Sequence, residues 1–207
     1  MQDNLIYLCG PHGSGKTTLA RELEKQNPRI MVPELFSRNI KFNTHPPYRQ
    51  VLKICGRAIE NYEYLDIAKK NPDKIVLGNR CIYDVFAYNQ VYYKKGWISK
   101  ETFDFYKKSS RDFFNDENEE PWAIFLNPGF ETVYKHLEKR WKEKGKKWKE
   151  DDLEYTRFAC QAYEYFKGNE NIFYINHEIS LESKEDIKKV NGWIKRIREK
   201  DLTFSLV

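Results

Sequence analysis

The stretch that most restricts the fold of this chain is residues 9–18, which read CGPHGSGKTT. An apolar run, NLIYLC, precedes it, and KTTLARELEKQ, which has helical character, follows. Within it, Gly10-x4-Gly15-Lys16-Thr17 has the spacing of a phosphate-binding loop placed between a strand and a helix. Glycines let successive backbone N–H groups converge on phosphate oxygens at the positive end of the helix. The stretch therefore predicts a phosphate cradle at the end of a first strand.

The rest of the chain alternates between the same two kinds of element. Apolar runs predict further strands at 29–34, 74–79, 122–127 and 171–176. Helical patterns occupy 48–70, about 84–115 with a break near Gly96 and a restart at Ser99, 129–144, 151–167 and 183–199. Buried strands that alternate with helices through short connections predict an α/β fold, a doubly wound five-stranded parallel sheet with helices on both faces.

Length and composition set the broad class. With 207 residues, of which 40% are hydrophobic and 32% charged, we expect one globular domain spanning residues 1–207. The N-terminus lacks a basic start, and no apolar stretch approaches the ~20 residues that span a bilayer, so we expect a cytoplasmic protein with no membrane partner. The cysteines lie far apart without a CxxC pair, which favours reduced, buried thiols over a zinc site; they are Cys9, Cys55, Cys81 and Cys160.

The loop assigns the donor side of the predicted site. Lys16 is expected to reach the β- and γ-phosphates of ATP, and the Thr17 hydroxyl to ligate Mg²⁺. The predicted ATP-binding residues are Gly10, Pro11, His12, Gly13, Ser14, Gly15, Lys16, Thr17, Thr18 and Arg140.

Three classes of protein use such a loop, and other motifs separate them. A regulatory GTPase carries Asn-Lys-x-Asp, which does not occur here. A motor ATPase carries an acidic residue at the end of a later strand, whereas two comparable strands here end in Gly78-Asn79-Arg80 and Asn127-Pro128. A small-molecule kinase needs an acceptor-side carboxylate, arginines around the transferred group and a mobile basic lid, and candidates for all three are present.

The acceptor side is predicted from residues that follow the second and third strands. Glu34 comes after the second strand, where its carboxylate would accept a proton from a hydroxyl or hold a Mg²⁺-bound water; an exposed loop glutamate is the alternative. Arg38 would touch the acceptor or remain a solvent-exposed charge. Arg80 would brace phosphate, and Asp84 and Tyr88 would contact the acceptor. The alternative for Arg80 and Asp84 is an ion pair that only stabilises a helix start.

A basic run supplies the predicted lid. Residues 135–149, KHLEKRWKEKGKKWK, hold eight Lys or Arg against two Glu. We expect a lid at about 140–152 with Gly145 as a flexible point, and a solvated helix face is the alternative. The lid cations would be Arg140, Lys144, Lys146 and Lys147. Trp141 and Trp148 would either stack on a base or, as we favour, cover the edge of the core.

In this order of motifs the chain resembles the nucleoside and nucleoside-monophosphate kinases, specifically the deoxynucleoside-kinase and thymidylate-kinase-like branch and related AAA-type ATPase-like kinase domains. The resemblance rests on the loop, on VPE at 32–34, on NRCIYDVFAYNQ at 79–90 and on the basic run. It implies that Glu34 is the catalytic base, Arg80 a phosphate or transition-state contact and Asp84 an acceptor contact. Asn79 departs from the family, which usually has Asp or Glu there, and His12 replaces an Asp that thymidylate kinases often carry.

These features lead to one principal hypothesis and two alternatives. The principal hypothesis is ATP- and Mg²⁺-dependent phosphoryl transfer to a nucleoside, a nucleoside monophosphate or a similar small metabolite, with Lys16, Glu34 and Arg80 as catalytic residues. The net charge of +5 and the basic run keep open a polynucleotide or RNA-end kinase. Asn79 keeps open a nucleotide-binding regulatory module without transfer activity. The sequence also leaves open a homodimer.

Overall fold

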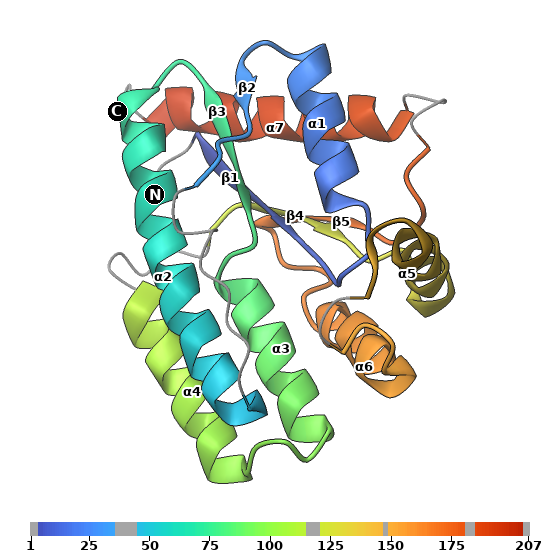
Figure 1. Ribbon diagram of the computed structural model, residues 1–207. Helices are drawn as coiled ribbons and strands as arrows, with labels where there is room; N and C mark the ends of the chain where they lie inside the picture. The colour runs from blue at the N-terminus through green and yellow to red at the C-terminus, as the bar shows by residue number, and fades with distance from the viewer. Residues whose placement is uncertain (1–3, 36–44, 115–120, 147–148, 181–184, 205–207) are drawn as a thin grey trace.

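The computed structural model describes residues 4–35, 45–114, 121–146, 149–180 and 185–204. It contains one sheet of five strands, which are all parallel and lie in the order β2-β3-β1-β4-β5 (Figure 1). The strands are β1 (Leu5–Cys9), β2 (Ile30–Met31), β3 (Ile75–Asn79), β4 (Ala123–Leu126) and β5 (Ile172–Ile175). The predicted doubly wound parallel sheet is confirmed.

Helices cover both faces of this sheet because its strands are apolar on both sides. In β1, Tyr7 packs into one hydrophobic cluster, and Ile6 and Leu8 pack into the other. Figure 1 shows α1 (Lys16–Gln26) and α7 (Glu185–Phe204) on one face. The other face carries α2 (Pro46–Lys70), α3 (Ile82–Lys94), α4 (Lys100–Phe114) and α6 (Leu153–Glu164). This burial on both faces explains why the strands read as continuous apolar runs.

Helix α5 (Phe130–Lys144) lies beside α6 at one end of the molecule (Figure 1). Val133 and Leu137 of α5 form a small hydrophobic cluster with Cys160 of α6, and Trp141 packs against it. Trp141 therefore covers the edge of a core, as favoured from the sequence. Trp148 lies outside the described residues.

The second strand is shorter than predicted, whereas the break predicted in the long helical section is present. The second strand, expected at 29–34, pairs only through Ile30 and Met31, and Pro33 cannot donate a ladder hydrogen bond. The long helical section is split into α3 and α4 at Gly96, whose φ of 65° lies in the left-handed region. The predicted restart is confirmed, because the Ser99 Oγ accepts a hydrogen bond from the Thr102 N–H at 3.2 Å.

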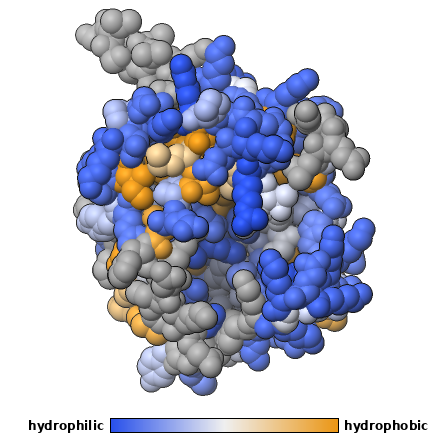
Figure 2. All heavy atoms as spheres, turned by 45° about the horizontal axis from the view of Figure 1, so that its top comes forward, coloured by the Kyte–Doolittle hydropathy of each residue, from blue (hydrophilic) through white to orange (hydrophobic). Residues whose placement is uncertain are grey.

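The face seen in Figure 2 is dominated by hydrophilic residues, and its hydrophobic side chains gather in a few small areas. Within the described ranges, the helices are all too short or too polar to span a bilayer.

The parallel strands bring several of the predicted site residues to one edge. Cys9 ends β1 and leads into the glycine-rich loop, while Asn79 ends β3 and leads into Arg80. The Arg80 N–H donates to the Leu8 carbonyl at 2.9 Å, which ties the end of β3 to the end of β1. Ligands of open α/β sheets bind at this carboxyl edge.

Candidate active site

The glycine-rich loop runs from Gly10 to Gly15 and is held tightly between β4 and α5. A Cβ on Gly10 would lie 2.2 Å from the Leu126 carbonyl oxygen, and Gly10 has a φ of 142°. A Cβ on Gly13 would lie 3.0 Å from the Leu137 Cγ, and its φ is 80°. Both positions therefore require glycine, as in a loop whose backbone N–H groups bind phosphate.

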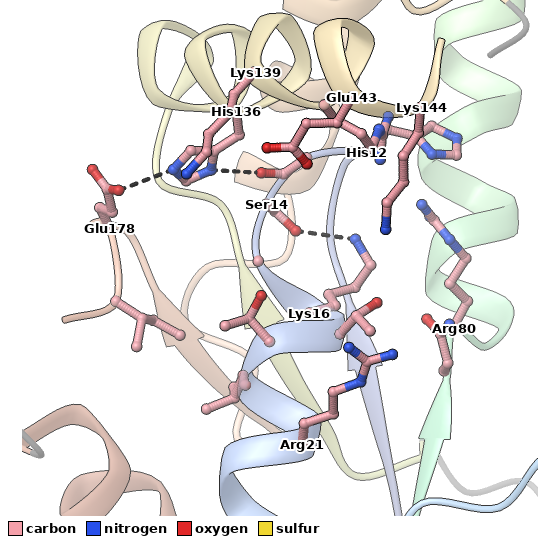
Figure 3. Close-up of a pocket in the computed structure, with 18 residues that line it drawn as sticks. His12, Ser14, Lys16, Arg21, Arg80, His136, Lys139, Glu143, Lys144 and Glu178 are labelled. Carbon is pink, nitrogen blue, oxygen red and sulfur yellow. Dashed lines mark hydrogen bonds and ion pairs between the residues drawn. The ribbon is translucent and has the colours of Figure 1, made fainter. Parts of the chain in front are cut away.

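Lys16, the first residue of α1, folds back over this loop. Its Nζ donates to the carbonyl oxygens of Gly10 at 2.9 Å and Pro11 at 2.6 Å, and to the Ser14 Oγ at 3.0 Å (Figure 3). Burial and the nearby Arg80 guanidinium lower the pKa of Lys16 well below its ordinary value. An anion that binds beside this buried ammonium would stabilise its charged form.

Arg80 adopts a left-handed backbone conformation, with a φ of 72°. This conformation is uncommon for a residue with a side chain and persists only where the surroundings enforce it. The Arg80 guanidinium donates to Asp84 Oδ1 at 2.5 Å and to the Tyr163 hydroxyl at 3.4 Å. The strained turn after β3 thus presents a fixed cation at the edge of the sheet.

Asp84 is the anchor of this arrangement and is only 2% exposed. Its carboxylate also accepts hydrogen bonds from the Tyr163 hydroxyl and from the Cys81 N–H, which caps α3. Burial alone would raise the pKa of Asp84, but Arg80 and Lys16 outweigh burial and hold the pKa below its ordinary value. The Arg80–Asp84 ion pair considered from the sequence is present, and in this structure Asp84 orients Arg80.

Tyr88 lies one helical turn after Asp84, and its ring lies near the side chains of Arg80 and His12. Its ring centroid is 5.3 Å from the Arg80 Cζ and 5.8 Å from the centroid of the His12 ring. Tyr88 and His12 also line a small cavity beside the loop. The predicted residues Arg80, Asp84, Tyr88 and His12 are therefore brought together by the fold.

A cavity of about 680 Å³, which we call the principal cavity, opens directly over the phosphate loop. Its walls include the loop from His12 to Thr18, the end of β3 and one face of α5 (Figure 3). Six Lys or Arg side chains line it against two Glu: Lys16, Arg21, Arg80, Lys139, Arg140 and Lys144 against Glu143 and Glu178. This excess of positive charge suits a polyanionic ligand.

Helix α5 supplies a wall that sequence reasoning identified only in part. His136, Lys139, Arg140, Glu143 and Lys144 recur at helical spacing and face the cavity (Figure 3). One ring nitrogen of His136 lies 2.8 Å from the Gly13 carbonyl oxygen, and the other lies 2.9 Å from Glu178 Oε1. His136 was missed, although this spacing within the basic run could have identified it.

Glu150 is a second residue that the sequence did not single out. It is 1% exposed, and its carboxylate accepts hydrogen bonds from Arg140 and, at 3.2 Å, from the Trp141 indole N–H. The His12 Nδ1 lies 3.8 Å away. Partial burial, with Arg80 and Lys16 nearby, lowers the pKa of His12 well below its ordinary value. Glu150 thus provides a carboxylate beside the loop position where thymidylate kinases often carry an Asp.

The segment predicted as a lid, about 140–152, has mixed structure. Residues 140–144 complete α5, and Asp152 caps α6 by accepting a hydrogen bond from the Tyr155 N–H at 2.9 Å. Gly145 ends α5 with a φ of 73°. Lys146 lies 3.5 Å from the Asp151 carboxylate, and Lys147 lies outside the described residues.

The predicted acceptor-side residues after β2 are less well defined. Glu34 is exposed and is not among the residues that line the principal cavity as the described chain defines it. Arg38 lies outside the described residues. The structure therefore brings most of the residues predicted for the donor side to one cavity, and the roles assigned to them, to Glu34 and to Arg38 stay predictions.

A parallel sheet in the order 2-3-1-4-5 and a glycine-rich loop between β1 and α1 define a P-loop nucleoside-triphosphate-binding fold. The family model described as AAA domain matches residues 5–123, and the chain belongs to this family. No curated protein sequence matches the chain.

Solved structures of deoxyadenosine kinase from M. mycoides have the same fold. The structure with bound dATP has a TM-score of 0.63 and 20% sequence identity, over 90% of this chain and 99% of that chain. The structure with the products dCMP and a flexible dCDP has a TM-score of 0.61 and 14% identity, over 91% and 98%. A third, with bound dCTP, has a TM-score of 0.56 and 16% identity, over 91% and 99%. The AAA-type part of the resemblance inferred from the sequence is confirmed by the family model, and the likeness to deoxynucleoside kinases is confirmed at the level of the fold.

Proposed function

We propose that this protein is a kinase that transfers the γ-phosphoryl group of ATP to a nucleoside, a nucleoside monophosphate or a similar small metabolite. The observation that carries the proposal is the convergence of the phosphate loop, the buried Lys16 and the anchored Arg80 on one cavity of about 680 Å³. The fold shared with deoxyadenosine kinases supports the choice of acceptor class.

The donor phosphates would bind over the loop. Their oxygens would accept hydrogen bonds from the loop N–H groups and from Lys16, which would exchange its present carbonyl partners for phosphate. Arg80 would stabilise charge on the transferred group without moving, because Asp84 already holds its guanidinium in place. Arg140 would approach the phosphates from α5.

The residues beside the loop fit Mg²⁺. The Thr17 hydroxyl and the Asn79 side chain both line the cavity. The buried Asn79 Oδ1 has no hydrogen-bond partner among the described residues, and Mg²⁺ prefers oxygen ligands completed by phosphates and waters. When bound, the ion would neutralise charge on the β- and γ-phosphates. Thr17 is the proposed protein ligand, and Asn79 would reach the ion directly or through a water.

The acceptor hydroxyl would approach from the side of β2 and β3. We assign Glu34 as the base that takes its proton, and Arg38, Asp84 and Tyr88 as residues of the acceptor side. Because Asp84 is buried and paired with Arg80, it would act on the acceptor through that guanidinium. The bound ligands of the deoxyadenosine kinase structures make deoxynucleosides the first acceptors to test.

The experiment is a transfer assay with γ-labelled ATP against nucleosides, nucleoside monophosphates and 5′-hydroxyl oligonucleotides. We expect label on a small acceptor, loss of that label in Lys16→Ala, and a large decrease in Glu34→Gln. Glu24→Gln, an exposed carboxylate on α1 that does not line the principal cavity, is the matched control and is expected to retain activity.

Two outcomes would replace the proposal. Label on oligonucleotides alone, with binding that weakens steeply as salt rises, would indicate a polynucleotide kinase. Tight binding of ATP with no transfer to any acceptor would indicate a nucleotide-binding regulatory module.

A further inference from the structure

His136, on α5, connects the phosphate loop to the segment that follows β5. Its Nδ1 lies 2.8 Å from the Gly13 carbonyl oxygen in the loop, and its Nε2 lies 2.9 Å from the Glu178 Oε1 after β5 (Figure 3). All three residues line the principal cavity. One side chain thus joins three parts of the site that lie far apart in the sequence.

Both partners of His136 accept hydrogen bonds, and neither has a proton to donate. A backbone carbonyl oxygen is an acceptor only, and the hydrogen bond from His136 holds the pKa of Glu178 below its ordinary value, so its carboxyl is ionised. A neutral imidazole carries a proton on one ring nitrogen and could therefore make one of the two bonds. Both bonds form only when His136 is an imidazolium ion.

The charges around His136 come from several elements. The charged groups that share its cavity are Lys16 and Arg21 of α1, Arg80 after β3, Glu178 after β5, and Lys139, Arg140, Glu143 and Lys144 of α5 itself. The six cations oppose a further positive charge, whereas the Glu178 carboxylate favours it by direct contact. Glu178 is therefore the acid that makes the imidazolium compatible with this cavity.

The hydrogen bond from His136 orients one peptide unit of the loop. The Gly13 carbonyl and the Ser14 N–H belong to the same trans peptide, in which they point in opposite directions. With the carbonyl held towards α5, the Ser14 N–H donates to the Pro11 carbonyl oxygen at 3.3 Å. The Lys16 Nζ donates to that same oxygen, so the Ser14 N–H and the Lys16 ammonium are directed at one place.

Gly13 itself does little to keep the peptide in this orientation. Its φ is 80°, and glycine changes backbone conformation more easily than residues with a side chain. If the peptide turned over, the negative end of its dipole would face the donor phosphates and repel them. A donor that holds the Gly13 carbonyl towards α5 therefore favours phosphate binding.

We propose that the His136 imidazolium is a positioning residue of the phosphate loop, which keeps the Ser14 N–H turned towards the donor phosphates and ties the loop to Glu178. The inference rests on the proposed function in taking ATP as the ligand of this cavity. It adds a residue that acts on the phosphates through the loop backbone.

Calorimetric titration of ATP with saturating Mg²⁺ at several pH values tests this role. We expect the wild type to lose affinity about tenfold between pH ~5.5 and ~8.5, the range in which histidine loses its proton, because one charge-assisted hydrogen bond to the loop is lost. His136→Asn should bind ATP weakly throughout and show no such step. A wild type without the step, or the same step in His136→Asn, would overturn the proposal.

Two further variants isolate the contribution of the bridge. Glu178→Gln keeps an acceptor oxygen but removes the charge, so the midpoint of the affinity step should move to lower pH by about half a unit. His177→Asn is the matched control, because His177 also contacts a carboxylate, with its Nε2 2.8 Å from Asp186 Oδ1, but is not among the described residues that line the cavity. It should keep the wild-type step, and an unmoved midpoint in Glu178→Gln would contradict the part assigned to Glu178.

Nuclear magnetic resonance of the His136 ring nitrogens tests the protonation in the unaltered chain. At pH ~6 we expect protons on both nitrogens, and the loss of one proton should follow the same pH profile as the loss of ATP affinity. A ring that carries a single proton over this whole range would overturn the proposal. Because these measurements report binding and protonation, absence of phosphoryl transfer would contradict the proposed function alone.

Discussion

The two walls of the principal cavity differ in how deeply their charged side chains are buried and how firmly they are held. On the sheet side, Lys16 and Arg80 are each about 9% exposed. Lys16 donates three hydrogen bonds within the loop, and the Arg80 guanidinium donates to Asp84 and to the Tyr163 hydroxyl. On the α5 side, Lys139, Glu143 and Lys144 are exposed. Both walls present cations to the same space (Figure 3).

This difference in burial and bonding indicates that the two walls have different roles in binding the ligand. Fixed donors in a water-poor site act on charge without reorganising, and salt screens them little. Exposed lysines on a helix attract anions at longer range and lose most of that effect in salt. The sheet wall should therefore set the position of the transferred phosphoryl group, whereas the α5 wall should mainly assist capture. The following predictions test this contrast in order of decreasing effect.

Lys16→Met should give the largest loss on the sheet wall. We expect transfer activity to fall about 1,000-fold, since a preorganised charged donor to the reacting group contributes ~10²–10³ or more. A steady-state assay on the acceptor that the screen identifies checks this. A loss of less than tenfold would contradict a central role for Lys16.

The same variant should be more stable than the wild type near neutral pH. The pKa of Lys16 is lowered in the folded state, so the unfolded chain binds more protons between that lowered pKa and ~10.4. The advantage of the variant is complete below the lowered pKa and shrinks as pH rises through this window. Denaturant unfolding of both proteins at several pH values measures it, and a constant difference would contradict the buried ammonium.

Asp84→Asn should remove the negative charge that pairs with Arg80 in the sheet wall. We expect a loss of about 3–5 kcal/mol in the free energy of unfolding, because the Arg80 guanidinium remains buried without its counter-ion. The pKa of Asp84 is depressed, so the wild-type advantage is present above pH ~4 and is lost as pH falls through the folded-state pKa. Urea unfolding at pH 7 and below pH 4 tests both statements, with the exposed Asp66→Asn as control.

Glu150→Gln should have an intermediate effect, because Glu150 holds Arg140 of α5 beside the loop. We expect ATP to bind about tenfold more weakly, as one charge-assisted hydrogen bond is worth ~1.5–3 kcal/mol. In an Arg140→Ala background the substitution should have little further effect. Calorimetric titration of the four proteins measures this coupling, and additive effects would show that Glu150 does not act through Arg140.

Lys139→Ala and Lys144→Ala should have the smallest effects. We expect less than threefold weaker ATP binding at physiological salt and stability within about 0.5 kcal/mol of the wild type. The loss should grow at low ionic strength, where exposed charges act at longer range. An effect as large as that of Lys16→Met would remove the distinction between the two walls.

Much of the fold could be predicted from the sequence because its signals are local. The loop pattern located β1 and α1, and continuous apolar runs located β3, β4 and β5. The second strand was predicted too long, since a two-residue pairing beside Pro33 leaves no periodic signal. Ser99 identified the start of α4 because its capping hydrogen bond depends on neighbouring residues alone.

The site was predictable only where its residues follow a motif. Lys16 and Arg80 could be placed from their strand ends, but their partners could not, because Tyr163 reaches Asp84 from a helix 79 residues further along the chain. His136 and Glu150 act through tertiary contacts with Gly13 and Arg140, and no local pattern encodes those contacts. Long-range packing, which sets these distances, leaves no periodic trace in one sequence.

The central claim is that the sheet wall, with Lys16 and Arg80, binds the terminal phosphates of a nucleotide donor. Calorimetric titration of ATP and AMP, each with Mg²⁺, into the wild type and Lys16→Met tests it most directly. We predict that the wild type binds ATP at least 100-fold more tightly than AMP, and that this preference falls below tenfold in Lys16→Met. Equal affinity of the wild type for ATP and AMP, or a preference that survives in Lys16→Met, would contradict the account.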